Sequence, residues 1–155
     1  MTELAEFLAN RGYVALPLAR TAVGHFHTSG TLNGRAVEIL VDTGASCTLI
    51  AMSLVQSLGL GAELADNDAG GAGGSIAQYL VTGADLRLGE FKPVLSSVAG
   101  MDFEHINATL AAQESVAIDV ILGVDVFDRH AAIIDYSSQT LFLSSSGSMQ
   151  GLAAA

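Results

Sequence analysis

A single carboxylate stands out in the segment AVEILVDTGASCTLI, residues 36–50. An apolar run that is typical of a buried strand ends abruptly at Asp42, and Thr43 and Gly44 follow directly. A charge in a buried position costs several kcal/mol unless another group pairs with it. A carboxylate at the end of a strand can instead be aimed into a cleft from a rigid scaffold. The pattern therefore predicts that Asp42 is a positioned acid or base.

The residues after Asp42 suit this chemistry. Thr43 offers a hydroxyl to neighbouring backbone, Gly44 lets that backbone approach closely, and Ser46 places a second hydroxyl near the carboxylate. The alternative is that Asp42 caps a helix or anchors a turn, because the tripeptide Asp-Thr-Gly occurs by chance. The flanking segments EILV and ASCTLI, and a second matching segment downstream, favour the acid or base.

The glycine-rich stretch GGAGGS, residues 70–75, has three readings. A phosphate-binding loop is disfavoured, because the Gly-Lys-Ser/Thr ending is missing and no clear helix follows. A flexible loop and a glycine-rich hairpin both remain open.

Other reactive side chains have structural explanations. Cys47 follows Asp42 closely but has no histidine near it in sequence, so we expect it to pack rather than to act as a nucleophile. His25 and His27 alternate on one face of a strand, and without a third ligand we expect them to face solvent. Asp125 is expected to make local hydrogen bonds. No metal and no cofactor are predicted.

The chain as a whole supports one globular domain. It has 155 residues, of which 50% are hydrophobic and 14% charged. A net charge of −10 argues against nucleic acid or an anionic membrane as a partner, and a single cysteine excludes an internal disulfide. The acidic N-terminus does not resemble a secretory signal, and no apolar window approaches 18 residues. A cytoplasmic location is the default expectation.

Short strands must position these side chains. Asn33-Gly34 predicts a two-residue hairpin turn between strands at 24–32 and 35–41. Further strands are expected at 13–18, 76–81, 84–91, 118–123, 131–136 and 140–144. Helical turns are expected at 52–60 and 124–130, whereas 2–10 fits a short helix or a loose arm and 102–115 a loop or a short helix. These elements predict a mainly β, barrel-like domain.

Three segments, in their order along the chain, resemble the retropepsin-like (retroviral-type) aspartic proteases. LVDTGASCTLI is similar to the catalytic loop, GGAGGSIAQY to the flap hairpin, and VILGVDVFDRHAAIIDY to the apolar-Gly segment and its helix. The last resembles bacterial single-domain members and the protease-like domain of DNA-damage-inducible ubiquitin-shuttle proteins. The resemblance implies a single-lobe acid-protease β-barrel with one or two short helices at 22–143. An N-terminal arm or short helix (1–21) and a flexible tail (144–155) would flank it.

The resemblance also implies a mechanism and residue roles. Two aspartates would share a proton and activate a water that attacks a peptide bond. Thr43 would bind the Thr43 of the other subunit across a two-fold axis. Gly44 would accept a hydrogen bond from the backbone of the substrate. His130 would be structural. The remaining roles would be substrate binding by Ala45, Ser46, Gly71, Ala72, Gly73, Gly74 and Ser75, and support of the site by Ile121, Leu122 and Gly123.

The chain carries only half of such a site. The nearest second candidate, Asp68-Ala69-Gly70, is not preceded by an apolar strand. The resemblance therefore implies an aspartic endopeptidase that acts on peptide or protein substrates as a homodimer, with one Asp42 from each subunit. The chain ends do not match the interleaving strands of retroviral proteases. The alternative is a non-catalytic domain of the same fold that binds extended peptides or mediates protein interaction.

Overall fold

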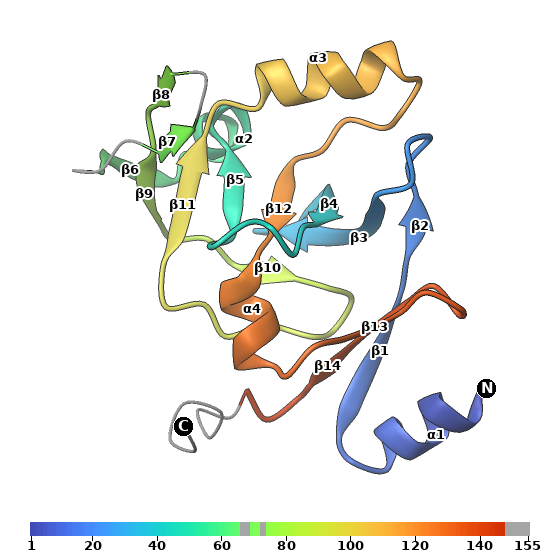
Figure 1. Cartoon of the computed structure of the whole chain (residues 1–155). Coiled ribbons are helices and arrows are strands. Elements are labelled where there is room, and N and C mark those ends of the chain that lie inside the picture. The colour runs from blue at the N-terminus through green and yellow to red at the C-terminus, as the bar shows by residue number, and fades with distance from the viewer. Residues whose placement is uncertain (66–68, 72–73, 148–155) are drawn as a thin grey trace.

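The computed structural model describes residues 1–65, 69–71 and 74–147 (Figure 1). The helices are α1 (Glu3–Ala9), α2 (Met52–Ser57), α3 (Glu104–Ala112) and α4 (Val124–Arg129). The strands are β1 (Tyr13–Pro17), β2 (Ala19–Arg20), β3 (Phe26–Leu32), β4 (Arg35–Val41), β5 (Leu49–Ala51), β6 (Gly61–Leu64), β7 (Ala69–Gly71), β8 (Gly74–Ile76), β9 (Tyr79–Thr82), β10 (Leu86–Arg87), β11 (Val98–Met101), β12 (Val120–Leu122), β13 (Ile133–Asp135) and β14 (Thr140–Ser144). Among the described helices, none is long and apolar enough to cross a membrane.

The mainly β class is confirmed, with small corrections. Most strands form one sheet in the order β10-β3-β4-β12-β5-β11-β9-β6, with β2 attached to β3. The two edge strands of this sheet, β10 and β6, do not pair with each other within the described residues, so the expected barrel is not closed. Within the described part of residues 22–143, three short helices are present where one or two were expected, because 102–115 contains a helix.

The hairpin between β3 and β4 fixes which face each side chain of β4 occupies. Asn33 and Gly34 both have positive φ, 49° and 82°, as the predicted two-residue turn requires. The register that follows pairs Leu32 with Arg35 and His27 with Leu40. Because side chains alternate along a strand, the burial of Val37 and Ile39 leaves Glu38, Leu40 and the position of Asp42 on the opposite face.

β12 lies between the two strands that flank Asp42. It runs parallel to β4, with Leu122 beside Val41, and antiparallel to β5, with Ile121 beside Leu49. The connection between β4 and β5, residues 42–48, must therefore pass the end of β12 to reach β5. We call residues 42–48 the Asp42 loop.

A second sheet joins distant parts of the chain. Its order is β1-β14-β13, so β14 is paired along both edges (Figure 1). The segment 1–21, expected to be an arm or a short helix, contains α1, β1 and β2. The proposed domain boundaries stay a prediction, and residues 148–155 of the expected tail lie outside the described residues.

His130 connects this second sheet to the loop before β11. Its side chain is 1% exposed. Nε2 accepts from the Val94 backbone N–H (2.9 Å), and Nδ1 lies 2.8 Å from the carbonyl oxygen of Ser144. Both bonds form together only when Nδ1 carries the proton and Nε2 does not. Phe91 packs edge-on against the ring at 5.0 Å between centroids. These contacts are those of the structural residue that the resemblance implied.

Replacing His130 by Ala should lower the free energy of unfolding by about 2 kcal/mol, because a buried imidazole loses its two hydrogen bonds and its packing against Phe91. Chemical denaturation of the variant and the wild type would measure the difference. Replacing the exposed His25 by Ala serves as the control and should change stability by less than about 0.5 kcal/mol. Equal losses in the two variants would contradict a structural role specific to His130.

Candidate active site

The sheet fixes the backbone of Asp42. Its N–H donates to the carbonyl oxygen of Leu122 at 3.1 Å, which continues the pairing of β4 with β12 by one residue. Asp42 itself is partly exposed at the end of β4. The predicted arrangement, a carboxylate presented from the end of a rigid strand, is therefore present.

A tight turn holds the Asp42 carboxylate. The Gly44 N–H donates to Asp42 Oδ1 at 2.8 Å, and the Ala45 N–H donates to the Asp42 carbonyl oxygen at 3.2 Å. A Cβ on Gly44 would lie 3.2 Å from Oδ1, so a larger residue would crowd the carboxylate. Thr43 and Ser46 are exposed next to it. The turn leaves Asp42 accessible while its carboxylate orientation is set by backbone.

The predicted support residues lie directly against the Asp42 loop. Ile121 and Leu122 are buried in β12, and Gly123 follows at the start of α4. A Cβ on Gly123 would lie 2.6 Å from the carbonyl carbon and oxygen of Cys47 and 2.8 Å from the carbonyl oxygen of Ala45. The Val124 N–H donates to that same Ala45 oxygen at 2.8 Å. Only glycine allows the two segments to approach so closely.

Asp125 has a partner that the sequence did not suggest. Its carboxylate accepts from the backbone N–H and from the hydroxyl of Thr48, which is 77 residues away. The expectation of local hydrogen bonds did not include this long-range contact. The two segments meet because β12 inserts between β4 and β5.

Cys47 lies in the Asp42 loop and is partly buried. Burial, followed by the negative charge of Asp125, raises the pKa of its thiol above the usual value, and a hydrogen bond with Ser46 offsets only part of the rise. A thiolate is the nucleophilic form of cysteine, so this environment disfavours nucleophilic chemistry. The position agrees with the packing role expected for Cys47.

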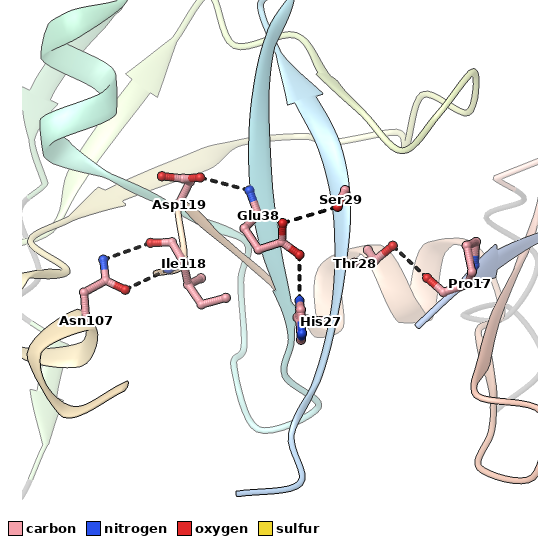
Figure 2. Close-up of polar contacts among 8 residues, drawn as sticks. All are labelled: Pro17, His27, Thr28, Ser29, Glu38, Asn107, Ile118 and Asp119. Carbon is pink, nitrogen blue, oxygen red and sulfur yellow. Dashed lines mark hydrogen bonds and ion pairs between the residues drawn. The ribbon is translucent and has the colours of Figure 1, made fainter. Parts of the chain in front are cut away.

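A polar network occupies the face of β4 that carries Asp42. Glu38 accepts from Ser29 and lies 2.6 Å from Nδ1 of His27, which is 9% exposed. Figure 2 shows the Glu38 carboxylate between these two side chains, with Asp119 bound to the Glu38 backbone N–H. His25 is exposed as expected, but His27 is buried and paired, so the prediction of a solvent-facing His27 was wrong.

The helix α3 lies on the same side of the sheet as this polar network. The Asn107 side chain makes two hydrogen bonds to the backbone of Ile118, which fix α3 to the segment before β12 (Figure 2). A pocket of about 380 Å³ lies between α3 and β4. Its lining is mostly apolar, with two imidazoles: Val23, His25, Leu40, His105, Ile106, Thr109, Leu110 and Gln113. Leu40 places this pocket two residues from Asp42 along β4.

The glycine-rich stretch forms a hairpin where the structure describes it. β6 pairs with β9, and β7 pairs with β8 through Gly71 opposite Gly74 and Gly70 opposite Ser75. Ala72 and Gly73, two of the predicted substrate-binding residues, lie outside the described residues. A second pocket, of about 580 Å³, lies between the β8–β9 arm of this hairpin and α2, and its lining includes Met52, Ile76 and Tyr79.

The structure brings the predicted Asp42 loop and the predicted support residues together, and it adds Thr48 and Asp125 to them. Thr48 had one sequence signal, a hydroxyl at the end of the loop, directly before the apolar residues Leu49 and Ile50. Within residues 1–65, 69–71 and 74–147, no group of three or more His, Cys, Asp or Glu side chains is placed to hold a metal ion.

Comparisons with known proteins agree with this arrangement. The model of a family described as aspartyl protease matches residues 28–126. The structure is similar to a retropepsin-like aspartic protease from Rickettsia conorii, with 21% identity, a TM-score of 0.53, and coverage of 84% of this chain and 90% of that chain. It is also similar to the retroviral protease-like domain of Ddi1 from Leishmania major, with 18% identity, a TM-score of 0.50, and coverage of 76% and 86%. The comparison with curated proteins gives no match. These similarities confirm the predicted retropepsin-like fold.

Proposed function

The chain belongs to the aspartyl protease family, and from that premise we propose that it is an aspartic endopeptidase whose catalytic group is Asp42. One observation carries the proposal. The accessible carboxylate of Asp42 is oriented by the Gly44 N–H, and its backbone is fixed by Leu122. Asp102 and Asp135 accept a similar turn bond, but the turn at Asp42 also lies against the buried segment that ends at Gly123, which holds the loop from below.

The proposed reaction needs two such carboxylates. One of them, ionised, takes a proton from water, and the water oxygen attacks the peptide carbonyl carbon. The other, protonated, donates a hydrogen bond to the oxygen on which negative charge develops. Two carboxylates in close contact cannot both ionise, so one shared proton maintains this division of roles.

A homodimer is the proposed source of the second carboxylate. The chain supplies one Asp-Thr-Gly loop, and a two-fold axis would place two copies face to face with the same surface patch used on both sides. Thr43 and Gly44 are exposed next to Asp42, where they could contact the partner and the substrate backbone.

The substrate is proposed to be an extended peptide with an apolar side chain near the cleaved bond. The pocket beside Leu40 and α3 would take that side chain, since residues in an extended chain are about 3.4 Å apart and Leu40 is two positions from Asp42. Ala45 and Ser46 would contact the peptide from the Asp42 loop. The hairpin of β7 and β8 would cover it as a flap, through Gly71, Gly74 and Ser75 and through Ala72 and Gly73 outside the described residues.

A peptide-library digest tests the proposal directly. We expect cleavage that pepstatin inhibits, with a bell-shaped dependence of rate on pH centred on the acid side. The two apparent constants of that profile would belong to the pair of aspartates. Digestion that resists pepstatin and increases above pH 8 would contradict the proposal and implicate the thiol of Cys47.

The assembly can be tested separately by sedimentation across a dilution series at pH 5 and pH 8. We expect a dimer at pH 5 that weakens at pH 8, because two ionised carboxylates at the axis repel. A strict monomer at micromolar concentration at both values, with and without a peptide inhibitor, would contradict the homodimer. That result would favour a non-catalytic domain that binds extended peptides.

A further inference from the structure

The contact between Thr48 and Asp125 offers an inference that rests on the proposed function and extends it. We propose that Asp125 is a positioning residue, which acts through Thr48 to set the conformation of the Asp42 loop. Asp125 does not lie in the loop, and the resemblance assigns it no role. Its carboxylate nevertheless accepts hydrogen bonds from Thr48, which is the last residue of the loop.

Four hydrogen bonds join the Asp42 loop to the start of α4. The Val124 N–H donates to the Ala45 oxygen (2.8 Å), and the Gly123 N–H donates to Thr48 Oγ (3.2 Å). The Thr48 N–H donates to Asp125 Oδ2 (3.0 Å), and the Thr48 hydroxyl donates to Asp125 Oδ1 (2.8 Å). Thr48 takes part in three of the four, and its 0% exposure excludes water as a substitute partner.

The direction of these bonds calls for a carboxylate at position 125. Thr48 Oγ accepts from the Gly123 N–H, so its own hydrogen points to Asp125 Oδ1. The Thr48 N–H points to Oδ2. Each oxygen of Asp125 therefore faces a donor, which an ionised carboxylate satisfies and an amide does not, because an amide presents N–H groups on one side. Hydrogen bonds to a charged acceptor are also the stronger kind.

The loop transmits this contact to Asp42. It is fixed at one end by the bond of Asp42 to Leu122, in the middle by the bond of Ala45 to Val124, and at the other end by Thr48. The Gly44 N–H, which orients the Asp42 carboxylate, lies between the first two of these points. If Thr48 is released, the backbone of the loop can shift, and a shift of about 1 Å at a catalytic group can reduce the rate about 100-fold.

Two pairs of variants test the role of Asp125. Asp125→Asn keeps the shape of the side chain but removes one acceptor, and Asp128→Asn makes the same change of charge on the exposed side of α4. Thr48→Val removes the hydroxyl, whereas Thr48→Ser keeps it. We expect kcat to fall about 10- to 100-fold in Asp125→Asn and Thr48→Val, with KM unchanged, and to stay near the wild-type value in Asp128→Asn and Thr48→Ser.

Cys47 provides a second readout that does not depend on peptidase activity. The charge of Asp125 is one cause of the raised pKa of this thiol. Removing that charge in Asp125→Asn should lower the thiol pKa, so alkylation should reach half its maximal rate at a lower pH than in wild type or Asp128→Asn. Amide hydrogen exchange at Gly123 should be at least about 10-fold faster in Thr48→Val than in Thr48→Ser, because the Gly123 N–H loses its acceptor.

The outcomes separate this inference from the proposed function. A wild-type protein that cleaves peptides, with Asp125→Asn and Asp128→Asn equally active, would overturn the inference and leave the proposed function intact. A wild-type protein without peptidase activity would overturn the proposed function, and the alkylation and exchange measurements would still decide whether Asp125 holds the loop. If Asp125→Asn does not fold, the comparison of Thr48→Val with Thr48→Ser tests the inference instead. Equal kcat and equal Gly123 exchange in those two variants would overturn the inference.

Discussion

Replacing Asp42 by Asn should reduce kcat by about 10²- to 10⁴-fold, the range associated with loss of a positioned acid or base. The fold should persist, because the amide oxygen of Asn can still accept from the Gly44 N–H and the backbone bond to Leu122 is unaffected. Rates on a peptide identified from the library digest, with thermal melting of each protein, would measure the two effects. Asp128→Asn is the matched control, since it removes the same charge at an exposed position.

A mixing experiment makes the same prediction more specific. If each site uses one Asp42 from each of two chains, the Asn variant should inhibit the wild-type protein by forming mixed dimers. At equal concentrations and with free exchange of subunits, the activity should fall to about half, as expected for random pairing in a two-fold dimer. Activity that does not change on mixing, under conditions where exchange is shown, would contradict a shared site. A pure variant that cleaves at the wild-type rate would contradict a role for Asp42.

Replacing Gly123 by Ala should cause the largest loss of stability among the single changes considered, about 3 kcal/mol or more. The new Cβ would meet backbone atoms of Cys47 and Ala45, and neither segment can move without breaking the bonds that join them. The backbone of Gly123 has φ −113°, which any residue can adopt, so the cost is one of space and not of conformation. A fall in melting temperature of about 10 °C is expected.

Gly61→Ala is a suitable control for this prediction. A Cβ at Gly61 would also meet a neighbour, but the neighbour is the side-chain hydroxyl of Thr82, which can rotate away. We therefore expect a loss below about 1 kcal/mol for Gly61→Ala. If both alanine variants melt at the same temperature, close packing of Gly123 under the Asp42 loop does not stabilise the protein.

The sequence predicted those parts of the site that depend on local signals. Asn33-Gly34 defines a two-residue turn, and the register that follows would also have placed Ser29 opposite Glu38. His27 lies on the same face of β3 as Ser29, so this register also permits its pairing with Glu38, which the expectation of a solvent-facing His27 did not include. The strand ending at Asp42 and the glycine at position 123 were recognised because both lie in short, specific segments.

The parts that were missed depend on contacts between distant segments. Nothing in the local pattern of Thr48 or Asp125 indicates that they meet, because their contact requires β12 to enter the sheet between β4 and β5. The segment 102–115 was ambiguous for a related reason. Its helix is held at Asn107 by the backbone of Ile118, a tertiary contact that helix propensity does not reveal.

The pairing of β1 with β14 has a consequence for how the protein matures. Residues 13–17 leave the ribosome long before residues 140–144, and at 5–20 residues per second the interval is on the order of 10 s. During this time β1 is a strand without its partner, and an unpaired strand is a template for association with other chains. Closure of this sheet is also a contact of large sequence separation, which makes it a slow step in folding. This protein is therefore most exposed to misassembly while its chain is still being synthesised.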